Sequence, residues 1–204
     1  VTVAAATVAS AETFVVTGIA DGPFISALLP SVSTPGNVVT IVGANFDPVP
    51  ARNRVRFNNT VAEVLSATET TITTVVPAAT GSGKVKVTNS RGIAVSPIDF
   101  IVVPPAYTTL KVTSVERVGT DGTAVVNTAA NDAFGARLFE AKEGELITIG
   151  LTAATIGGAN VRVYGPDNTE LAQAHLTPTA PGMQVPKLTT TGTYAILVFP
   201  NAVG

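Results

Sequence analysis

Alternation of apolar and polar residues with a period of two runs through almost the whole chain, and no stretch shows a helical period. Residues 54–77, RVRFNNTVAEVLSATETTITTVVP, illustrate the pattern, since their apolar side chains alternate with threonines and charged residues. Successive side chains of a β-strand point to opposite faces, so such a segment buries one face and exposes the other. The pattern predicts an all-β protein.

Turn-rich pieces divide the alternating segments into short strands at regular spacing, which is typical of a β-sandwich. The strands are predicted at residues 37–43, 53–58, 60–67, 70–77, 83–89 and 98–104, and again at 136–141, 145–152, 159–166, 169–176 and 192–200. Residues 89–97 and 177–192 are interpreted as loops, and residues 102–112 as a linker stiffened by Pro104 and Pro105. We therefore predict two tandem immunoglobulin-like or jelly-roll-like β-sandwiches.

Composition excludes several classes of function. The 12 Lys and Arg residues against 14 Asp and Glu residues leave a net charge of -2, so no strong field recruits nucleic acid or an anionic membrane. The chain has no cysteine, which rules out disulfides, thiolate metal sites and thiol nucleophiles. No apolar run approaches the roughly 18 to 20 residues that cross a bilayer. A start at Val1 without a signal-like segment indicates an excerpt from a longer precursor.

An internal match links the beginning of the chain to a later hairpin. Five residues recur in the same order: Val1, Val3, Ser10, Phe14 and Val16 correspond to Val85, Val87, Ser96, Phe100 and Val102. The turn between the second and third of these residues is two residues shorter in the first copy. Residues 1–18 are therefore predicted to be the C-terminal hairpin of a preceding copy of the first module.

Five segments follow one another between residues 24 and 103: FISALLPSVSTPGNVVTIVGANF, VRFNNTVAEV, SATETTITTVVP, GSGKVKVTNSRGIAVS and DF. Their order and spacing resemble the IPT/TIG family of immunoglobulin-like modules. The resemblance implies one such domain over residues 19–104. It also implies a spacer, adhesion or sugar-binding role rather than catalysis.

Three later segments, FEAKEGELITIGL, NVRVYGPDNTEL and GTYAILVFP, resemble the bacterial pre-peptidase C-terminal (PPC) type of β-sandwich. Similar modules occur in RHS/YD-repeat surface proteins. The resemblance implies a second sandwich over residues 105–204. Because a further strand usually follows the GTY strand in these modules, this sandwich is expected to lack its last strand.

The residues that could perform chemistry are few and scattered. His175 is the only histidine and no GxSxG motif accompanies it, so we interpret it as an ordinary strand residue. Asp132 and Asp167 each stand beside an asparagine; each suits a turn, and whether either binds Ca²⁺ stays open because such sites need several carboxylates. We expect no enzyme activity and no cofactor.

Three further signals were considered: an acidic cluster, a glycosylation motif and the tyrosines. Glu140, Glu143 and Glu145 are interrupted by Lys142, and we interpret them as a charged turn rather than a glycosidase pair. Asn58 matches a glycosylation acceptor by chance. The candidate aromatic contacts are Tyr107, Tyr164 and Tyr194.

Alternation in RNRVRF and GKVKV gathers cations on one face. Val55, Phe57, Val85 and Val87 are expected to point inward, so the opposite face would carry Arg52, Arg54, Arg56, Lys84 and Lys86. Arg54, Arg56, Lys84 and Lys86 form our candidate ligand or partner face. The alternative is that these cations only keep an apolar sheet soluble and discourage edge pairing, with Glu63 and Glu69 neutralising them.

The function predicted from the sequence is a non-catalytic structural or adhesive module of a large bacterial cell-surface or secreted protein. Two alternatives stay open, namely a subunit of an extracellular fibre assembled by strand complementation and an accessory carbohydrate-binding module of a secreted hydrolase. The expected partners are neighbouring Ig-like modules of the same protein, with a polysaccharide, a matrix protein or further copies of the chain as alternatives. The expected location is extracellular or on the cell surface.

Overall fold

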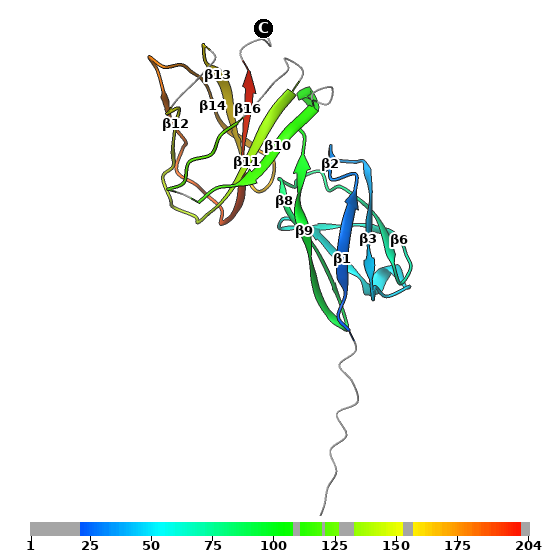
Figure 1. The fold of residues 1–204 in the computed structure, drawn as a ribbon. Coiled ribbons are helices and arrows are strands. Elements are labelled where there is room, and N and C mark those ends of the chain that lie inside the picture. Colours follow the sequence, from blue (N-terminus) through cyan, green and yellow to red (C-terminus); the bar gives the residue numbers. More distant parts are fainter. Residues whose placement is uncertain (1–20, 108–110, 120, 127–132, 153–156, 201–204) are drawn as a thin grey trace, which may run out of the picture.

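Strands account for nearly all regular structure in the computed structural model of the protein, which describes residues 21–107, 111–119, 121–126, 133–152 and 157–200. Figure 1 shows two bodies stacked end to end, with one long strand running from the first toward the second. The prediction of all-β, immunoglobulin-like sandwiches is confirmed. The predicted repeat at residues 1–18 lies outside the described residues. None of the described helices is long and apolar enough to cross a membrane.

The first body consists of two sheets that face each other. One sheet has the order β1-β3-β7-β6, formed by β1 (Phe24–Leu29), β3 (Val38–Ala44), β7 (Thr71–Val75) and β6 (Val64–Ala67). The other has the order β2-β9-β8-β4-β5, formed by β2 (Val32–Ser33), β9 (Gly92–Val102), β8 (Gly83–Asn89), β4 (Arg54–Phe57) and β5 (Thr60–Ala62). A short 3₁₀ helix, η1 (Pro50–Arg52), precedes β4. Alternate residues of both sheets fill one core that includes Ile41, Phe57, Ile72, Val85 and Phe100.

Two predictions about the first body are wrong. Residues 92–97 belong to β9 and not to a loop, because the Ser96 hydroxyl takes part in the pairing with β8 at a register shift. It accepts a hydrogen bond from the Val85 N–H at 3.0 Å and donates one to the Ile98 carbonyl at 2.7 Å. The predicted strand at 60–67 is divided into β5 and β6, which belong to different sheets. Strands β1 and β2 were not predicted.

The second body has one large sheet and a small one. The large sheet has the order β10-β11-β16-β13-β14, formed by β10 (Lys111–Arg117), β11 (Ala133–Ala141), β16 (Gly192–Pro200), β13 (Ala159–Tyr164) and β14 (Glu170–Leu176). The small sheet pairs β12 (Thr148–Gly150) with β15 (Gly182–Gln184). A core that includes Phe139, Val163, Leu176, Met183 and Tyr194 lies between them.

The boundaries of the second body differ from the prediction at three places. The predicted loop at 177–192 contains β15, and β12 is shorter than the strand predicted at 145–152. The predicted linker begins inside β9, continues through the 3₁₀ helix η2 (Pro105–Tyr107) and ends inside β10. Strand β16 lies between β11 and β13 and pairs with both, whereas the absence of a further strand stays a prediction.

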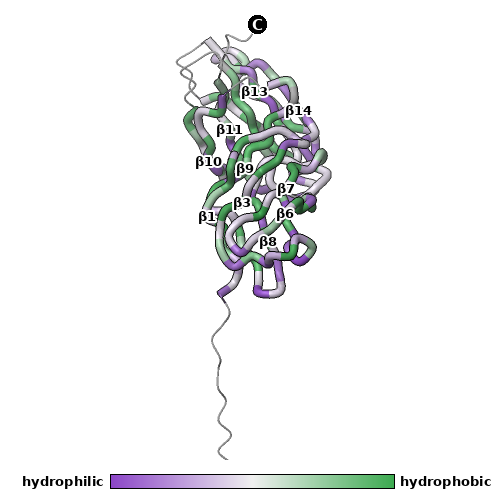
Figure 2. Tube along the Cα trace, turned by 90° about the vertical axis from the view of Figure 1, so that its right-hand side faces the viewer, coloured by the Kyte–Doolittle hydropathy of each residue, from purple (hydrophilic) through white to green (hydrophobic). Residues whose placement is uncertain are grey.

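A third apolar cluster joins the two bodies. Val32, Ile101 and Val103 of the first body pack with residues of the large second sheet, among them Phe134, Ala136, Leu138, Leu197 and Phe199. These second-body residues alternate along β11 and β16 with those that face the small sheet, so both faces of these two strands are buried. In Figure 2 hydrophobic colouring is present along β9 and β11, both of which contribute residues to this cluster. The bodies are therefore packed against each other and are not joined by a linker alone.

Candidate binding site at the junction of the two modules

A charged bridge crosses the junction beside the apolar cluster. Arg117, the last residue of β10, donates two hydrogen bonds to the carboxylate of Asp99 in β9, at 2.9 and 2.7 Å. Its third nitrogen donates to Glu140 of β11 at 2.7 Å. The hydrogen bond from Arg117 to Asp99 is the main cause of a raised pKa of Arg117, and Glu140 adds to it. Bidentate geometry of this kind fixes orientation as well as contributing energy.

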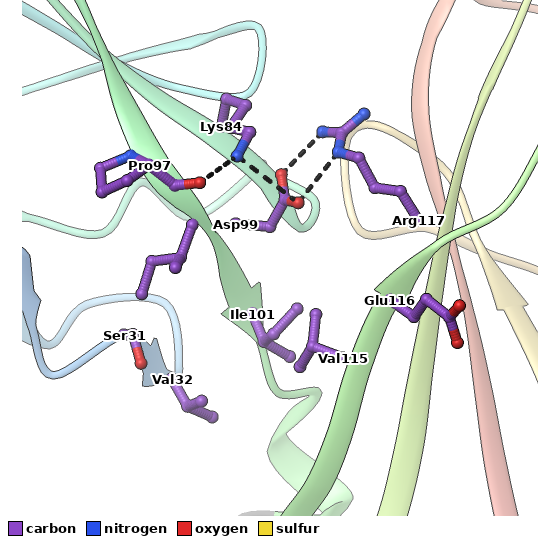
Figure 3. A pocket seen from close by; sticks show the side chains of 10 residues that line it. Ser31, Val32, Lys84, Pro97, Asp99, Ile101, Val115, Glu116 and Arg117 are labelled. Atoms are coloured by element: carbon purple, nitrogen blue, oxygen red, sulfur yellow. Dashed lines mark hydrogen bonds and ion pairs between the residues drawn. The ribbon is translucent and has the colours of Figure 1, made fainter.

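Asp99 also receives a cation from its own sheet. Lys84 is its ladder partner in β8, and the Lys84 ammonium lies 3.9 Å from the carboxylate. The same ammonium donates a hydrogen bond to the Pro97 carbonyl at 2.8 Å. Figure 3 shows the Asp99 carboxylate between Lys84 and Arg117. The side chain of Asp99 is only 8% exposed, and these two partners compensate for the burial of its carboxylate.

Backbone and amide contacts hold the other side of the junction. Gly81 donates its N–H to the Pro166 carbonyl at 2.7 Å. The buried side-chain amide of Asn58 donates to the carbonyls of Ser82 and Thr193, both at 3.2 Å. Asn58 is therefore part of the junction, which agrees with the interpretation of its glycosylation motif as a chance match.

Two hollows lie beside the bridge, and both are lined by Lys84 and Arg117. The first, of about 330 Å³, is drawn in Figure 3 and also includes Val32, Pro97, Ile101 and Val115. The second has a volume of about 360 Å³. The residues that line it are mostly of polar type and come from both modules: Asn58, Asn59, Lys84, Lys86, Arg117, Glu140, Gly192 and Thr193. We call this second space the junction hollow.

The sequence-predicted cations are brought together only in part. Arg56 and Lys86 are ladder partners, and Arg54 stands opposite Thr88 on the same outer face. Lys84 shares that side of the sheet but is turned to Asp99 and Pro97. Arg52 does not belong to the group, because it lies in η1, where its guanidinium is 3.9 Å from Asp47. We use the name cationic face for Arg54, Arg56 and Lys86.

Asp99 was missed by sequence reasoning, which assigned the neutralising role to Glu63 and Glu69. Among the described residues, Asp99 is the acid that pairs with one of the four predicted cations. Within the described parts of the chain, Arg54, Arg56 and Lys86 have no ion pair. A signal for Asp99 was present in the sequence, since it is a charged residue between apolar residues in a strand that pairs with GKVKV.

The remaining candidate residues have structural partners. His175 Nδ1 lies 3.0 Å from Asn160 Oδ1, across the β13–β14 ladder. Asp167 accepts hydrogen bonds from the Thr169 N–H at 3.0 Å and its hydroxyl at 2.8 Å. Burial acts to raise the pKa of Asp167, but these hydrogen bonds lower it below its ordinary value. Asp132 lies outside the described residues. No group of three metal-binding side chains occurs among the residues with described positions.

The acidic turn and the tyrosines are also accounted for by packing. Glu140 lies in β11 and not in the turn; its exposed side chain accepts a hydrogen bond from the Thr193 hydroxyl at 2.6 Å and another from Arg117. Glu143 does lie in an exposed turn, as predicted. Tyr107 packs against Phe199 with ring centroids 4.6 Å apart. The three tyrosines therefore serve the interior and the junction, since Tyr164 and Tyr194 are buried and donate hydrogen bonds to Glu170 and to the Thr190 carbonyl.

Loss of the Asp99 charge should loosen the bridge. We expect Asp99→Asn to lower the free energy of unfolding by about 1 to 3 kcal/mol, because it weakens charge-assisted hydrogen bonds and leaves Arg117 partly unpaired. Urea denaturation of the variant and the parent chain measures the difference. Glu69→Gln, at an exposed turn, removes the same charge and should change stability by less than about 0.5 kcal/mol. Equal losses in the two variants would contradict the assigned role of Asp99.

Comparison with solved structures gives distant likenesses. An auxiliary nutrient binding protein from Bacteroides ovatus is 19% identical, with a TM-score of 0.38 over 42% of this chain and 22% of that chain. The gamma-CGTase of alkalophilic Bacillus clarkii is 22% identical, with a TM-score of 0.37 over 90% of this chain and 22% of that chain. SGBP-B from a complex xyloglucan utilization locus in Bacteroides uniformis is 15% identical, with a TM-score of 0.33 over 89% of this chain and 68% of that chain.

The chain thus spans about a fifth of the length of the first two proteins. Among curated proteins, none matches the chain. A family model, in contrast, matches the first module: residues 23–102 correspond to the family described as the IPT/TIG domain, which supports that assignment for this part of the chain.

Proposed function

We propose that the pair of sandwiches is a non-catalytic structural and adhesive module of a large bacterial cell-surface or secreted protein, acting as a spacer or a binding stalk. The observation that carries this proposal is the junction. Three kinds of contact join the modules there: an apolar cluster, the Arg117 bridge and backbone hydrogen bonds. A junction of this kind fixes the angle between modules, which a stalk requires. A flexible chain of sandwiches would need none of these contacts.

The proposal includes a division of the chain and a location. We propose the hairpin of a preceding repeat at 1–18, the IPT/TIG domain at 19–104 and the PPC-like sandwich at 105–204. The IPT/TIG match supports the middle part of this division. An extracellular or surface location, with neighbouring Ig-like modules and a polysaccharide or matrix protein as partners, follows from the same family resemblance.

The distance between the modules tests the proposal. Because the chain has no cysteine, spin labels can be attached to Glu69→Cys in the first module and to Gln173→Cys in the second, both at exposed positions. We expect one narrow distance distribution in double electron–electron resonance. A pair within the first module, Glu69→Cys with Arg91→Cys, supplies the width expected for a rigid body. A much broader distribution between the modules would contradict the rigid stalk.

A further inference from the structure

Apolar residues flank the cationic face on both sides. The ladders place Val95, Lys86, Arg56 and Val61 in one row across β9, β8, β4 and β5. A neighbouring row holds Ile93, Thr88 and Arg54. The apolar members are exposed, by 66% for Ile93 and 49% for Val61 and Val95. The outer face of this sheet thus combines unpaired cations with open aliphatic surface.

Charge on this face is uncompensated. Arg56 and Lys86 stand directly opposite each other, an arrangement that disfavours the fold when the charges are alike. Arg56 donates one hydrogen bond to the Asn59 carbonyl, at 3.2 Å, which orders the side chain but leaves its charge in place. In the described part of the chain, no carboxylate lies within ion-pair distance of the cationic face. An external anion would therefore relieve the repulsion.

The cationic face continues into the junction hollow through Lys86, which belongs to both. The other charges that line the hollow already have partners, since Lys84 and Arg117 pair with Asp99, and Glu140 pairs with Arg117. What remains is a polar space bordered by the amide of Asn59, which also donates to the Thr191 carbonyl at 3.4 Å, and by Thr193, whose hydroxyl donates to Glu140. Its volume of about 360 Å³ is at the lower end of the range for small-ligand sites. Such a space suits a hydroxyl-rich group.

We infer that an acidic polysaccharide binds along this track, with its carboxylate or sulfate groups on Arg54, Arg56 and Lys86 and one sugar ring in the junction hollow. Asn59 and Thr193 face hydroxyl groups of that ring, while Val61 and Val95 lie against C–H surfaces of its neighbours. An acidic protein fits less well. Protein interfaces usually centre on an apolar side chain buried in a pocket, whereas polar residues line this hollow. The inference rests on the proposed function, since both modules line the hollow.

Isothermal titration calorimetry with three defined polymers tests the inference. Polygalacturonate carries carboxylates, dextran sulfate carries sulfates, and dextran is neutral. We expect one or both acidic polymers to bind and dextran not to bind. Because the contacts are between exposed charges, raising the salt from about 50 mM to about 500 mM should weaken binding strongly. The acidic polymer that binds with the higher affinity identifies the preferred anion, carboxylate or sulfate.

Variants locate the site. The double change Arg56→Gln and Lys86→Gln should weaken binding about tenfold, since each exposed charge pair contributes a factor of a few. The control combines Lys142→Gln with Lys187→Gln, which removes the same two positive charges from exposed positions of the second module. It should leave binding unchanged. Asn59→Ala should weaken binding of the acidic glycan several-fold, yet leave binding of poly-L-glutamate as it was.

Three results would overturn the inference: no binding of either acidic glycan, equal weakening by the two double variants, or indifference of glycan binding to Asn59→Ala. Spin-label distances measured on the same variants distinguish two outcomes: failure of the polysaccharide site and failure of the proposed rigid stalk. A narrow distribution without glycan binding rejects the polysaccharide site and leaves the rigid stalk. A broad distribution in the parent chain rejects the stalk itself.

Discussion

Gly81→Val should separate the two modules. A Cβ atom at Gly81 would lie 2.5 Å from the Gly165 carbonyl oxygen and 2.9 Å from the Pro166 carbonyl carbon, and both belong to the second module. These are backbone atoms, so no side-chain rotation relieves the clash. The substitution also displaces the hydrogen bond from Gly81 to Pro166. We expect the spin-label distance between modules to change from one narrow peak to a broad distribution, with a loss of about 2 to 3 kcal/mol or more of stability.

Gly119→Val is the matched control for this experiment, because an added Cβ at Gly119 meets no atom within 4 Å. It should leave both the distance distribution and the unfolding midpoint close to those of the parent chain. If Gly81→Val kept the narrow distribution, the close approach of Gly81 to Gly165 and Pro166 would not be what holds the modules together.

Leu138→Ala should cost about 3 to 5 kcal/mol, because Leu138 is fully buried in the cluster shared by the two modules and its loss leaves a cavity. The cavity lies between the large second sheet and the end of β9, so we expect the second module to unfold at lower urea concentration than in the parent chain. Urea denaturation followed by circular dichroism measures the change.

The control for Leu138→Ala is Leu146→Ala, since Leu146 is 77% exposed and has little packing to lose. Its cost should stay within about 0.5 kcal/mol. A small loss in Leu138→Ala would mean that this face of the sheet is not covered in solution, and the packing of the two modules would have to be revised.

Local sequence patterns were sufficient for individual strands. β8 and β16 have the predicted bounds, because their alternation begins and ends at clear turn residues. β9 was predicted too short, since Ser96 and Pro97 are typical loop residues and only the partner strand shows that the Ser96 hydroxyl completes the pairing. Alternation predicted five cations on the outer side of one sheet; the ladders place four of them there, whereas Arg52 lies in η1. The pairing of Lys84 with Asp99 depends on ladder register, which alternation does not define.

The junction could not be predicted from alternation, because it brings together residues far apart in the sequence. One signal did exist in β11, where Leu138 and Phe139 are adjacent and both apolar. A strand with one solvent face alternates, whereas apolar neighbours indicate burial on both faces. That observation predicts a covered second face, although it does not say that β9 of the first module supplies the cover.

The central place of β16 has a mechanical consequence. Figure 1 shows the start of β1 and the end of β16 at opposite ends of the molecule, so tension along the long axis is transmitted through β16. Ladder hydrogen bonds lie across the strand direction, and β16 has them on both sides, with β11 and with β13. Such tension loads the two ladders in shear, and their bonds must break together instead of opening one after another. Extraction of β16 would therefore have to break both ladders at once.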